Sequence, residues 1–210
     1  MRIGLASDSL GNVDGLVRAL EHLARAQVDR VYFLGARLAD LDAALALRRG
    51  VSRDAAEPSS DAEFLAAVEG ALARQAAAKP DPLDGRIVKV ASRACAEHVS
   101  GVYPPKQVDL VEGRICCLVH DKGELTRDDI ANATILFHGN TPAAGVVAIG
   151  PRVFVTPGPL RAPAAGAPAT FAIADVGPSE LTLSVFGEDL AELRVHRAPL
   201  SGGASKLSVR

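Results

Sequence analysis

Two side chains that could bind a metal ion follow predicted strands in this sequence. Asp8 comes directly after the apolar run 2–7, and His120 ends the apolar run 114–120. An open α/β sheet places its functional side chains at the carboxyl ends of its strands. Carboxylate and imidazole groups are common metal ligands. They also have structural uses: Asp8 could cap the helix that follows, and His120 could be a hydrogen-bonded histidine at a strand end.

The elements that would position these residues alternate between strand and helix in the first part of the chain. The apolar spacing predicts strands at 2–7, 30–34 and 86–91, and helices at 12–27, 40–49 and 60–78. Asn12 is the predicted N-cap of the first helix, and Gly50 ends the second. This alternation indicates parallel α/β winding.

The rest of the chain is rich in short strands. They are predicted at 107–111, 114–120, 134–138, 145–149, 152–155, 170–175, 181–186 and 190–196, with a short helix at 125–131. We therefore expect an α/β fold of the α+β sandwich kind, with two packed mixed β-sheets flanked by helices. A single domain would span 1–198, with a helical excursion at about 51–85. A flexible C-terminal tail is expected at 199–210, where Ser and Gly are frequent.

Short motifs at the predicted strand ends resemble those of a known family. They are Ser7-Asp8-Ser9-Leu10-Gly11-Asn12, Phe33-Leu34-Gly35-Ala36, Val90-Ala91-Ser92-Arg93-Ala94-Cys95, Cys116-Cys117-Leu118-Val119-His120, His138-Gly139-Asn140-Thr141-Pro142 and Thr156-Pro157-Gly158-Pro159-Leu160. In order and spacing, from about Met1 to Leu193, the chain resembles the calcineurin-like metallophosphoesterase superfamily, in its small bacterial and archaeal phosphodiesterase branch. The resemblance implies a four-layer fold and two divalent metals that polarise a phosphoester and activate water.

The resemblance also implies that most of the metal ligands have been lost. Five positions where the family has a ligand carry Leu10, Ala36, Ala94, Asn140 and Pro142. Leucine, alanine and proline side chains have no lone pair to donate, so a metal would lose most of its ligands. Only Asp8 and His120 retain a suitable side chain. The resemblance therefore implies a degenerate metal site, with no catalytic residues and no bound cofactor.

Residues near the lost positions leave other kinds of site open. Asp121 and His138 lie one residue or two from former ligand positions, and with Asp8 and His120 they could form a rebuilt metal site. Side chains alternate along a strand, so a shift of one residue points them to the other side. Arg93 could point into the old cleft and bind an anion without metal.

Three functions follow from these alternatives. The first is a catalytically inactive pseudoenzyme that acts as a protein-binding scaffold or regulatory subunit; a eukaryotic retromer subunit that resembles this family offers an analogy. The second is a metal-dependent phosphodiesterase or phosphatase with a rearranged site and weakly bound Mn, Mg or Zn. The third is a metal-free sensor of a phosphorylated ligand. The helical excursion could be a partner-binding element or a solvated outer helix.

Composition indicates which partners and which cellular compartment to expect. The 210 residues carry a formal net charge of −2 and few aromatics, which argues against a nucleic-acid partner. We expect no signal peptide and no membrane span. Three cysteines without metal or disulfide spacing favour a reducing cytoplasm. Cys116 and Cys117 are predicted to be buried, whereas Cys95, in a loop near His98, is the thiol to test for reactivity. The oligomeric state stays open.

Overall fold

The computed structural model describes residues 1–35, 37–50, 81–83, 85–90, 105–161 and 168–200. The predicted helix 60–78, and most of the excursion around it, lie outside the described residues. So do Ala36, Arg93, Ala94, Cys95 and His98. In the part of the chain that is described, no helix is long and apolar enough to cross a membrane.

The first part of the chain has the predicted alternation. Its elements are β1 (Arg2–Ala6), α1 (Val13–Arg25), β2 (Arg30–Phe33), α2 (Leu38–Arg48) and β3 (Ile87–Lys89), and the three strands run parallel. The Asn12 side chain accepts a hydrogen bond from the Gly15 N–H and so caps α1, as predicted. Leu16, Leu20 and Leu23 form the buried face of α1.

One sheet extends these strands on the β1 side. The added strands are β9 (Thr170–Val176), β10 (Glu180–Gly187) and β11 (Glu192–Pro199), and the order is β11-β10-β9-β1-β2-β3. Because β1 pairs antiparallel with β9, the sheet is mixed. The start of the chain therefore lies in the middle of a sheet, so that the loop after β1 is surrounded by other elements.

The second sheet has the order β4-β5-β6-β8-β7. These strands are β4 (Lys106–Val111), β5 (Arg114–Val119), β6 (Ile135–His138), β7 (Gly145–Ile149) and β8 (Arg152–Thr156). Between β5 and β6 lie the 3-10 helix η1 (Lys122–Glu124) and α4 (Arg127–Asn132). The single helix predicted at 125–131 is wrong at its start, because a capping box between Thr126 and Asp129 begins α4 at Arg127.

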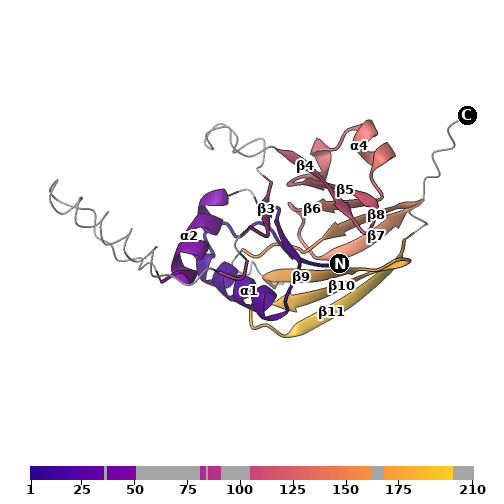
Figure 1. Cartoon of the computed structure of the whole chain (residues 1–210). Coiled ribbons are helices and arrows are strands. Elements are labelled where there is room, and N and C mark those ends of the chain that lie inside the picture. Colours follow the sequence, from indigo (N-terminus) through magenta and orange to yellow (C-terminus); the bar gives the residue numbers. More distant parts are fainter. Residues whose placement is uncertain (36, 51–80, 84, 91–104, 162–167, 201–210) are drawn as a thin grey trace, which may run out of the picture.

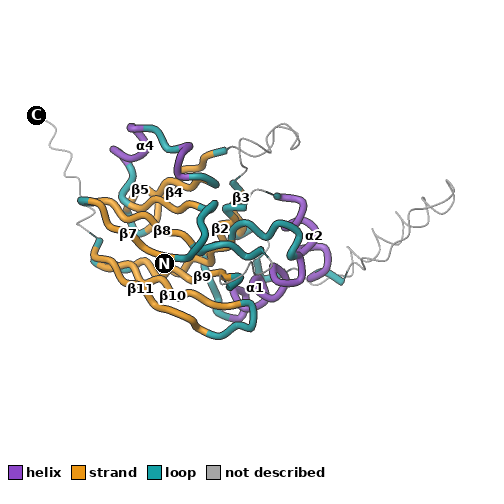
Figure 2. The backbone as a smooth tube through the Cα atoms, turned by 180° about the vertical axis from the view of Figure 1, so that it is seen from behind, coloured by secondary structure: helices purple, strands orange, loops and turns teal. Residues whose placement is uncertain are grey.

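The two sheets pack face to face, with helices outside them (Figures 1 and 2). Side chains from both sheets, among them Leu5, Phe137 and Val155, form the core between them. On the outer face of the first sheet, α1 and α2 cover a second apolar cluster that includes Phe33 and Phe171. On the outer face of the second sheet, α4 covers a smaller cluster around Leu136. The predicted fold of two mixed sheets flanked by helices is confirmed.

The last strand is longer than predicted. It runs to Pro199, and Leu200 is 4% exposed and belongs to the core between the sheets. The Leu200 N–H also donates to the Ser179 carbonyl. The predicted tail, which was placed from 199 onward, therefore starts too early, because apolar burial continues to Leu200. Residues 201–210 lie outside the described part.

Candidate functional site

Asp8 lies in the loop between β1 and α1, at the carboxyl end of a central strand. Its φ is +47°, a left-handed conformation that aspartate tolerates better than most residues. Leu10 (φ +44°) and Gly11 (φ +94°) continue this conformation. Asp8 is 7% exposed in this tight loop. Its buried carboxylate therefore needs hydrogen-bond donors from the protein.

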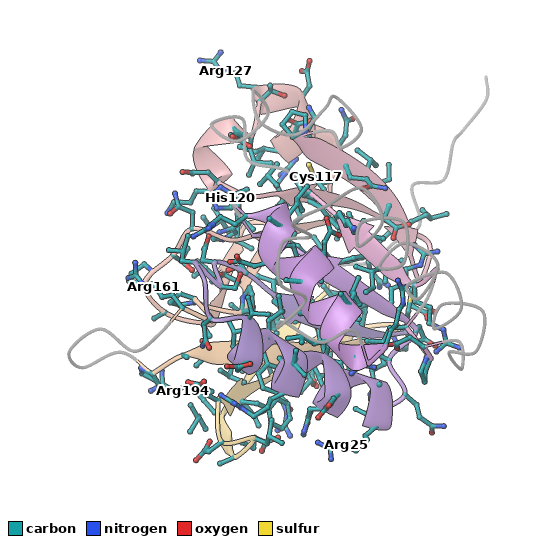
Figure 3. The ribbon with its side chains drawn as sticks, turned by 90° about the vertical axis from the view of Figure 1, so that its left-hand side faces the viewer. Arg25, Cys117, His120, Arg127, Arg161 and Arg194 are labelled. Atoms are coloured by element: carbon teal, nitrogen blue, oxygen red, sulfur yellow. The ribbon has the colours of Figure 1, made fainter. Side chains whose placement is uncertain are left out.

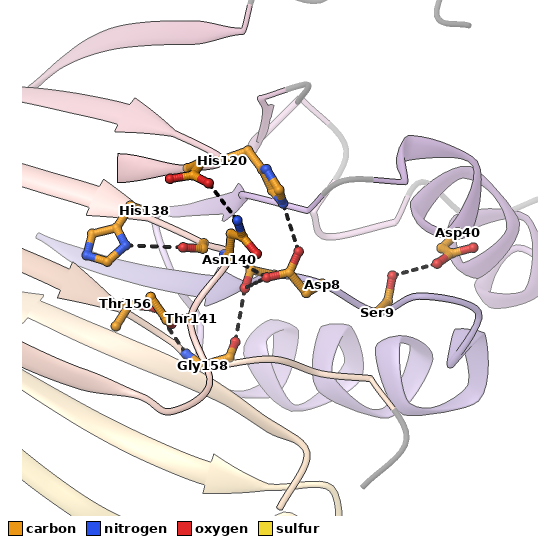
Figure 4. Close-up of polar contacts among 12 residues, drawn as sticks. Asp8, Ser9, Asp40, His120, His138, Asn140, Thr141, Thr156 and Gly158 are labelled. Carbon is orange, nitrogen blue, oxygen red and sulfur yellow. Dashed lines mark hydrogen bonds and ion pairs between the residues drawn. The ribbon is translucent and has the colours of Figure 1, made fainter. Parts of the chain in front are cut away.

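Three protein groups contact the Asp8 carboxylate (Figure 4). Oδ1 lies 2.8 Å from His120 Nε2, and Oδ2 accepts from the Asn140 backbone N–H at 2.7 Å and from the Ser7 hydroxyl at 3.1 Å. An ionised carboxylate only accepts hydrogen bonds, so this contact is a hydrogen bond when His120 Nε2 carries a proton. The two residual ligand-type residues therefore lie within hydrogen-bond distance of each other.

This arrangement decides between the structural roles considered for the two residues. Asp8 is not the cap of α1, because Asn12 has that role and the Asp8 oxygens face His120 and Asn140. His120 is a hydrogen-bonded histidine one residue beyond β5, as one interpretation predicted.

A glycine allows the third partner to approach. A Cβ on Gly139 would lie 2.5 Å from the Leu34 carbonyl oxygen and 3.1 Å from the His120 carbonyl oxygen. Only glycine fits between the ends of β2 and β5 at this point. The turn after β6 can therefore bring the Asn140 N–H to Asp8, and Asn140 itself has a φ of +49°.

Asp121 belongs to a neighbouring contact rather than to the Asp8 carboxylate. Its Oδ2 accepts from the Asn140 side-chain amide at 2.6 Å, and its Oδ1 accepts from the Gly123 N–H at 2.7 Å. The Gly123 N–H and then the Asn140 amide lower the pKa of Asp121. The carboxylate thus caps η1 and anchors the Asn140 side chain.

His138 faces away from Asp8 (Figure 4). Its Nδ1 lies 3.2 Å from the Gly139 carbonyl oxygen, and its ring is edge-on to Phe154. Burial lowers the pKa of His138. Among the described residues, no group of three or more His, Cys, Asp or Glu side chains could hold a metal ion. The rebuilt four-residue site is therefore not formed, because His138 and Asp121 have other partners.

A cleft of about 320 Å³ opens beside this cluster. Three of the positions predicted to have lost a ligand line it, Leu10, Asn140 and Pro142, together with Asp8, His120, Thr141, Pro159 and Arg161. The motifs placed Leu10, Asn140 and Pro142 at one site although they are far apart in sequence, and the structure brings them together. Ala36 and Ala94, the other two lost positions, lie outside the described residues, as does Arg93.

Two residues of the site escaped the sequence analysis. Arg161 follows the turn at Gly158 and lines the cleft, and within the described structure its guanidinium has no hydrogen bond or ion pair. Asp40 of α2, 5% exposed, accepts from the Ser9 hydroxyl at 2.8 Å and from the Gly11 N–H at 2.7 Å (Figure 4). Asp40 thereby fixes the loop that carries Asp8. The only sequence signal for it was an acidic residue near a helix start.

The two cysteines of β5 are buried, as predicted. Cys116 and Cys117 are 0% and 1% exposed. Burial raises the pKa of the Cys116 thiol to about 12 and that of the Cys117 thiol to about 11. Neither thiol has the lowered pKa of a nucleophile.

Comparison with known proteins places this geometry in context. The chain matches a sequence profile described as the calcineurin-like phosphoesterase superfamily domain over residues 1–178. No curated protein matches it.

Several solved structures share the fold. A predicted phosphoesterase from Streptococcus pneumoniae TIGR4 is 17% identical, with a TM-score of 0.59 over 94% of this chain and 97% of the other. The phosphoesterase YfcE from E. coli is 20% identical, with a TM-score of 0.55 over 93% and 98%. Vps29 from Chaetomium thermophilum is 14% identical, with a TM-score of 0.56 over 96% and 99%. The profile covers most of the chain, and the neighbours share its two mixed sheets. The chain therefore belongs to the calcineurin-like phosphoesterase superfamily.

Proposed function

We propose that this chain is a non-catalytic member of its superfamily, which acts in the cytoplasm as a protein-binding scaffold or regulatory subunit. The observation that carries the proposal is the Asp8 carboxylate, whose two oxygens accept from His120, Asn140 and Ser7. Hydrogen-bond donors of the protein thus occupy both oxygens of the carboxylate, which metal ions would contact in an enzyme of this kind.

The cleft fits a metal centre poorly. Leu10 and Pro142 line it without offering any side-chain donor, and His120 Nε2 is engaged with Asp8. A divalent ion needs several N or O ligands that converge on one point. The described residues offer too few of them.

An exposed apolar surface supports a protein partner. Val108 and Leu110 of β4 are 60% and 63% exposed, and Ile115 of β5 is 43% exposed. Leu110 pairs directly with Ile115, and Val108 lies two residues along the same face of β4, so the three side chains form one patch. Contiguous exposed apolar surface is typical of interaction sites.

Metal analysis and a hydrolysis assay test the loss of catalysis. Purified protein is expected to carry substoichiometric Mn, Fe, Zn or Mg and to leave bis(p-nitrophenyl) phosphate intact when metal is added. As a matched control, five substitutions restore the ligand types at the lost positions: Leu10→His, Ala36→Asp, Ala94→Asn, Asn140→His and Pro142→His. This variant should gain metal affinity. Stoichiometric metal and metal-dependent turnover in the natural chain, abolished by Asp8→Ala, would instead support the rearranged phosphodiesterase.

Affinity purification tests the partner surface. A partner that the natural chain retains should be lost with Leu110→Glu but kept with Val195→Glu, because Val195 is a similarly exposed residue on the other sheet. Equal retention by the natural chain and Leu110→Glu would contradict a role for this patch.

Arg161 favours a second candidate, a metal-free sensor of a phosphorylated ligand. Its guanidinium lines the cleft beside Thr141 and, in the described residues, is unpaired, so it can replace metal charge in binding a phosphate group. Phosphorylated metabolites should then raise the melting temperature of the natural chain but not that of Arg161→Met. Equal shifts for both proteins, or none, would remove the sensor.

A further inference from the structure

A second cavity, of about 220 Å³, adjoins the cleft. Pro142 lines both, and the second cavity is otherwise bounded by Ala143, Ala144, Pro168 and Thr170 on one side and by β10 and β11 on the other. In Figure 3 the labelled His120, Arg161 and Arg194 lie along the same side of the molecule. Among the described residues, Pro142 is the one position predicted from the motifs to be a former ligand that lines this cavity.

The register of β11 places two basic side chains in the cavity. Arg194 lies opposite Val185 and His196 opposite Leu183 on β10. Side chains alternate along a strand, so Arg194 and His196 share one face, the face of Val185 and Leu183 toward the other sheet. The register shifts between Val185 and Phe186, and the additional residue on β11 is Leu193, which also lines the cavity.

Both basic groups lack partners in the described structure. Arg194 forms no hydrogen bond or ion pair there, and His196 Nε2 is a buried nitrogen without a hydrogen-bond partner. A buried polar atom left unpaired is rare in a native protein and indicates a missing ligand or water. Burial, and then the neighbouring Arg194, lower the pKa of His196, so its ring is neutral near pH 7 and can offer one N–H.

The rest of the described lining is mostly apolar. Pro142, Ala144, Val185 and Leu193 present hydrocarbon, and the Thr170 hydroxyl donates to the Pro157 carbonyl. None of the described lining residues is Asp or Glu. Since a water molecule occupies about 30 Å³ of liquid, the volume corresponds to about seven waters. This is room for a small molecule with one polar end and a short chain.

We propose that this cavity binds a small organic carboxylate with a short apolar tail. The planar Arg194 guanidinium pairs with the carboxylate, the His196 N–H donates to it, and the tail packs against Val185 and Pro142. This site is separate from the Asp8–His120 cluster and does not depend on the proposed function.

Titration with pentanoate, followed by two-dimensional amide NMR, tests the site. Pentanoate should shift the backbone amide signals of β11 and of residues 142–144. It should bind at least about tenfold more tightly than the neutral isostere pentanamide, because pentanamide cannot form the charge-assisted pair with Arg194. Arg194→Met should abolish the difference. Arg197→Met is the matched control, since Arg197 is on the same strand but on its opposite face, and it should bind pentanoate as the natural chain does.

Four results would overturn the proposal. Equal affinity for pentanoate and pentanamide would show a merely apolar cavity. If inorganic phosphate bound with the same affinity as pentanoate, the site would recognise negative charge alone. Equal loss of binding in the Arg197→Met and Arg194→Met variants, or no shifts at all, would show that Arg194 does not hold the ligand. Dispersed amide spectra of both variants establish that they are folded, and His196→Phe should weaken pentanoate binding independently.

Discussion

At the scale of single residues, Asp8 joins three separate parts of the chain. Its partners come from the end of β1, from the residue after β5 and from the turn after β6. The carboxylate is the acceptor for the buried His120 ring and for the partly buried Asn140 N–H, so it contributes to stability.

Asp8→Ala is therefore expected to lower the free energy of unfolding by about 1–3 kcal/mol for each buried donor left without an acceptor. Asp42→Ala is the control, because the Asp42 side chain is 61% exposed and its ion pair with Lys89 should contribute less than about 1 kcal/mol. Urea unfolding with and without EDTA measures both variants. If Asp8→Ala unfolded at the same urea concentration as the natural chain, the hydrogen bonds of Asp8 would not contribute to stability. A large loss of stability of the natural chain in EDTA would point to a bound metal instead.

The two thiols of β5 give a second prediction at this scale. With pKa values of about 12 and 11 and almost no exposure, Cys116 and Cys117 should not react with a disulfide reagent at pH 8 while the protein is folded. In a Cys95→Ser background, both thiols should react only after denaturation. Rapid labelling of the folded variant would show that β5 opens readily.

At the scale of elements, an ion pair connects α2 with the turn before β3. Arg48 Nε and its second terminal nitrogen donate to the two oxygens of Asp81 at 2.7 and 2.8 Å, and the side chains are 8% and 3% exposed. Such a bidentate, buried pair fixes the point where the chain returns from the excursion to the sheet.

Removing Arg48 takes the bidentate cationic donor away from a buried carboxylate, so Arg48→Met should lower the free energy of unfolding by about 3–5 kcal/mol. Arg48 lowers the pKa of Asp81. The unfolded chain takes up this proton near pH 3.9, but the folded chain does so only at lower pH, so the free energy of unfolding should fall as pH falls below about 4. Asp81→Asn should flatten this acid dependence. Asp175→Asn is the control, because the ion pair of Asp175 with Arg2 is about half exposed.

The order of elements could be predicted because it depends on local pattern. Alternating apolar runs and helical spacing identified β1, α1, β2 and α2, and Asn12 and Gly50 marked a beginning and an end. Details set by long-range packing could not. The end of β11 at Pro199 depends on Leu200 entering a core built by residues far away, and the start of α4 depends on the Thr126–Asp129 capping box.

The site was predicted in part for the same reason. Motif spacing predicted that Asp8, His120 and the positions without a ligand would share one site, and Leu10, Asn140 and Pro142 line one cleft with Asp8 and His120. The direct Asp8–His120 contact joins residues 112 positions apart and follows from how the two sheets pack. Arg161 and Asp40 belong to no pattern, since a single charged residue in a loop or at a helix start is common.

At the scale of the whole molecule, the cleft lies where the two sheets meet. The first sheet supplies Asp8 after β1, and the second supplies His120 after β5 and Asn140 after β6. The hydrogen bonds of Asp8 therefore link the sheets at one end of the sandwich.

The Asn140 amide makes this link measurable without a ligand or an assay of activity. Its proton is held by the Asp8 carboxylate, so it can exchange with solvent deuterium only when the two sheets part at this end or the turn after β6 swings away. In Asp8→Asn the neutral acceptor should speed its exchange, while the amide of Leu118 in the middle of β5 should exchange as before. The exchange rate of one proton thus reports how often this end of the molecule opens.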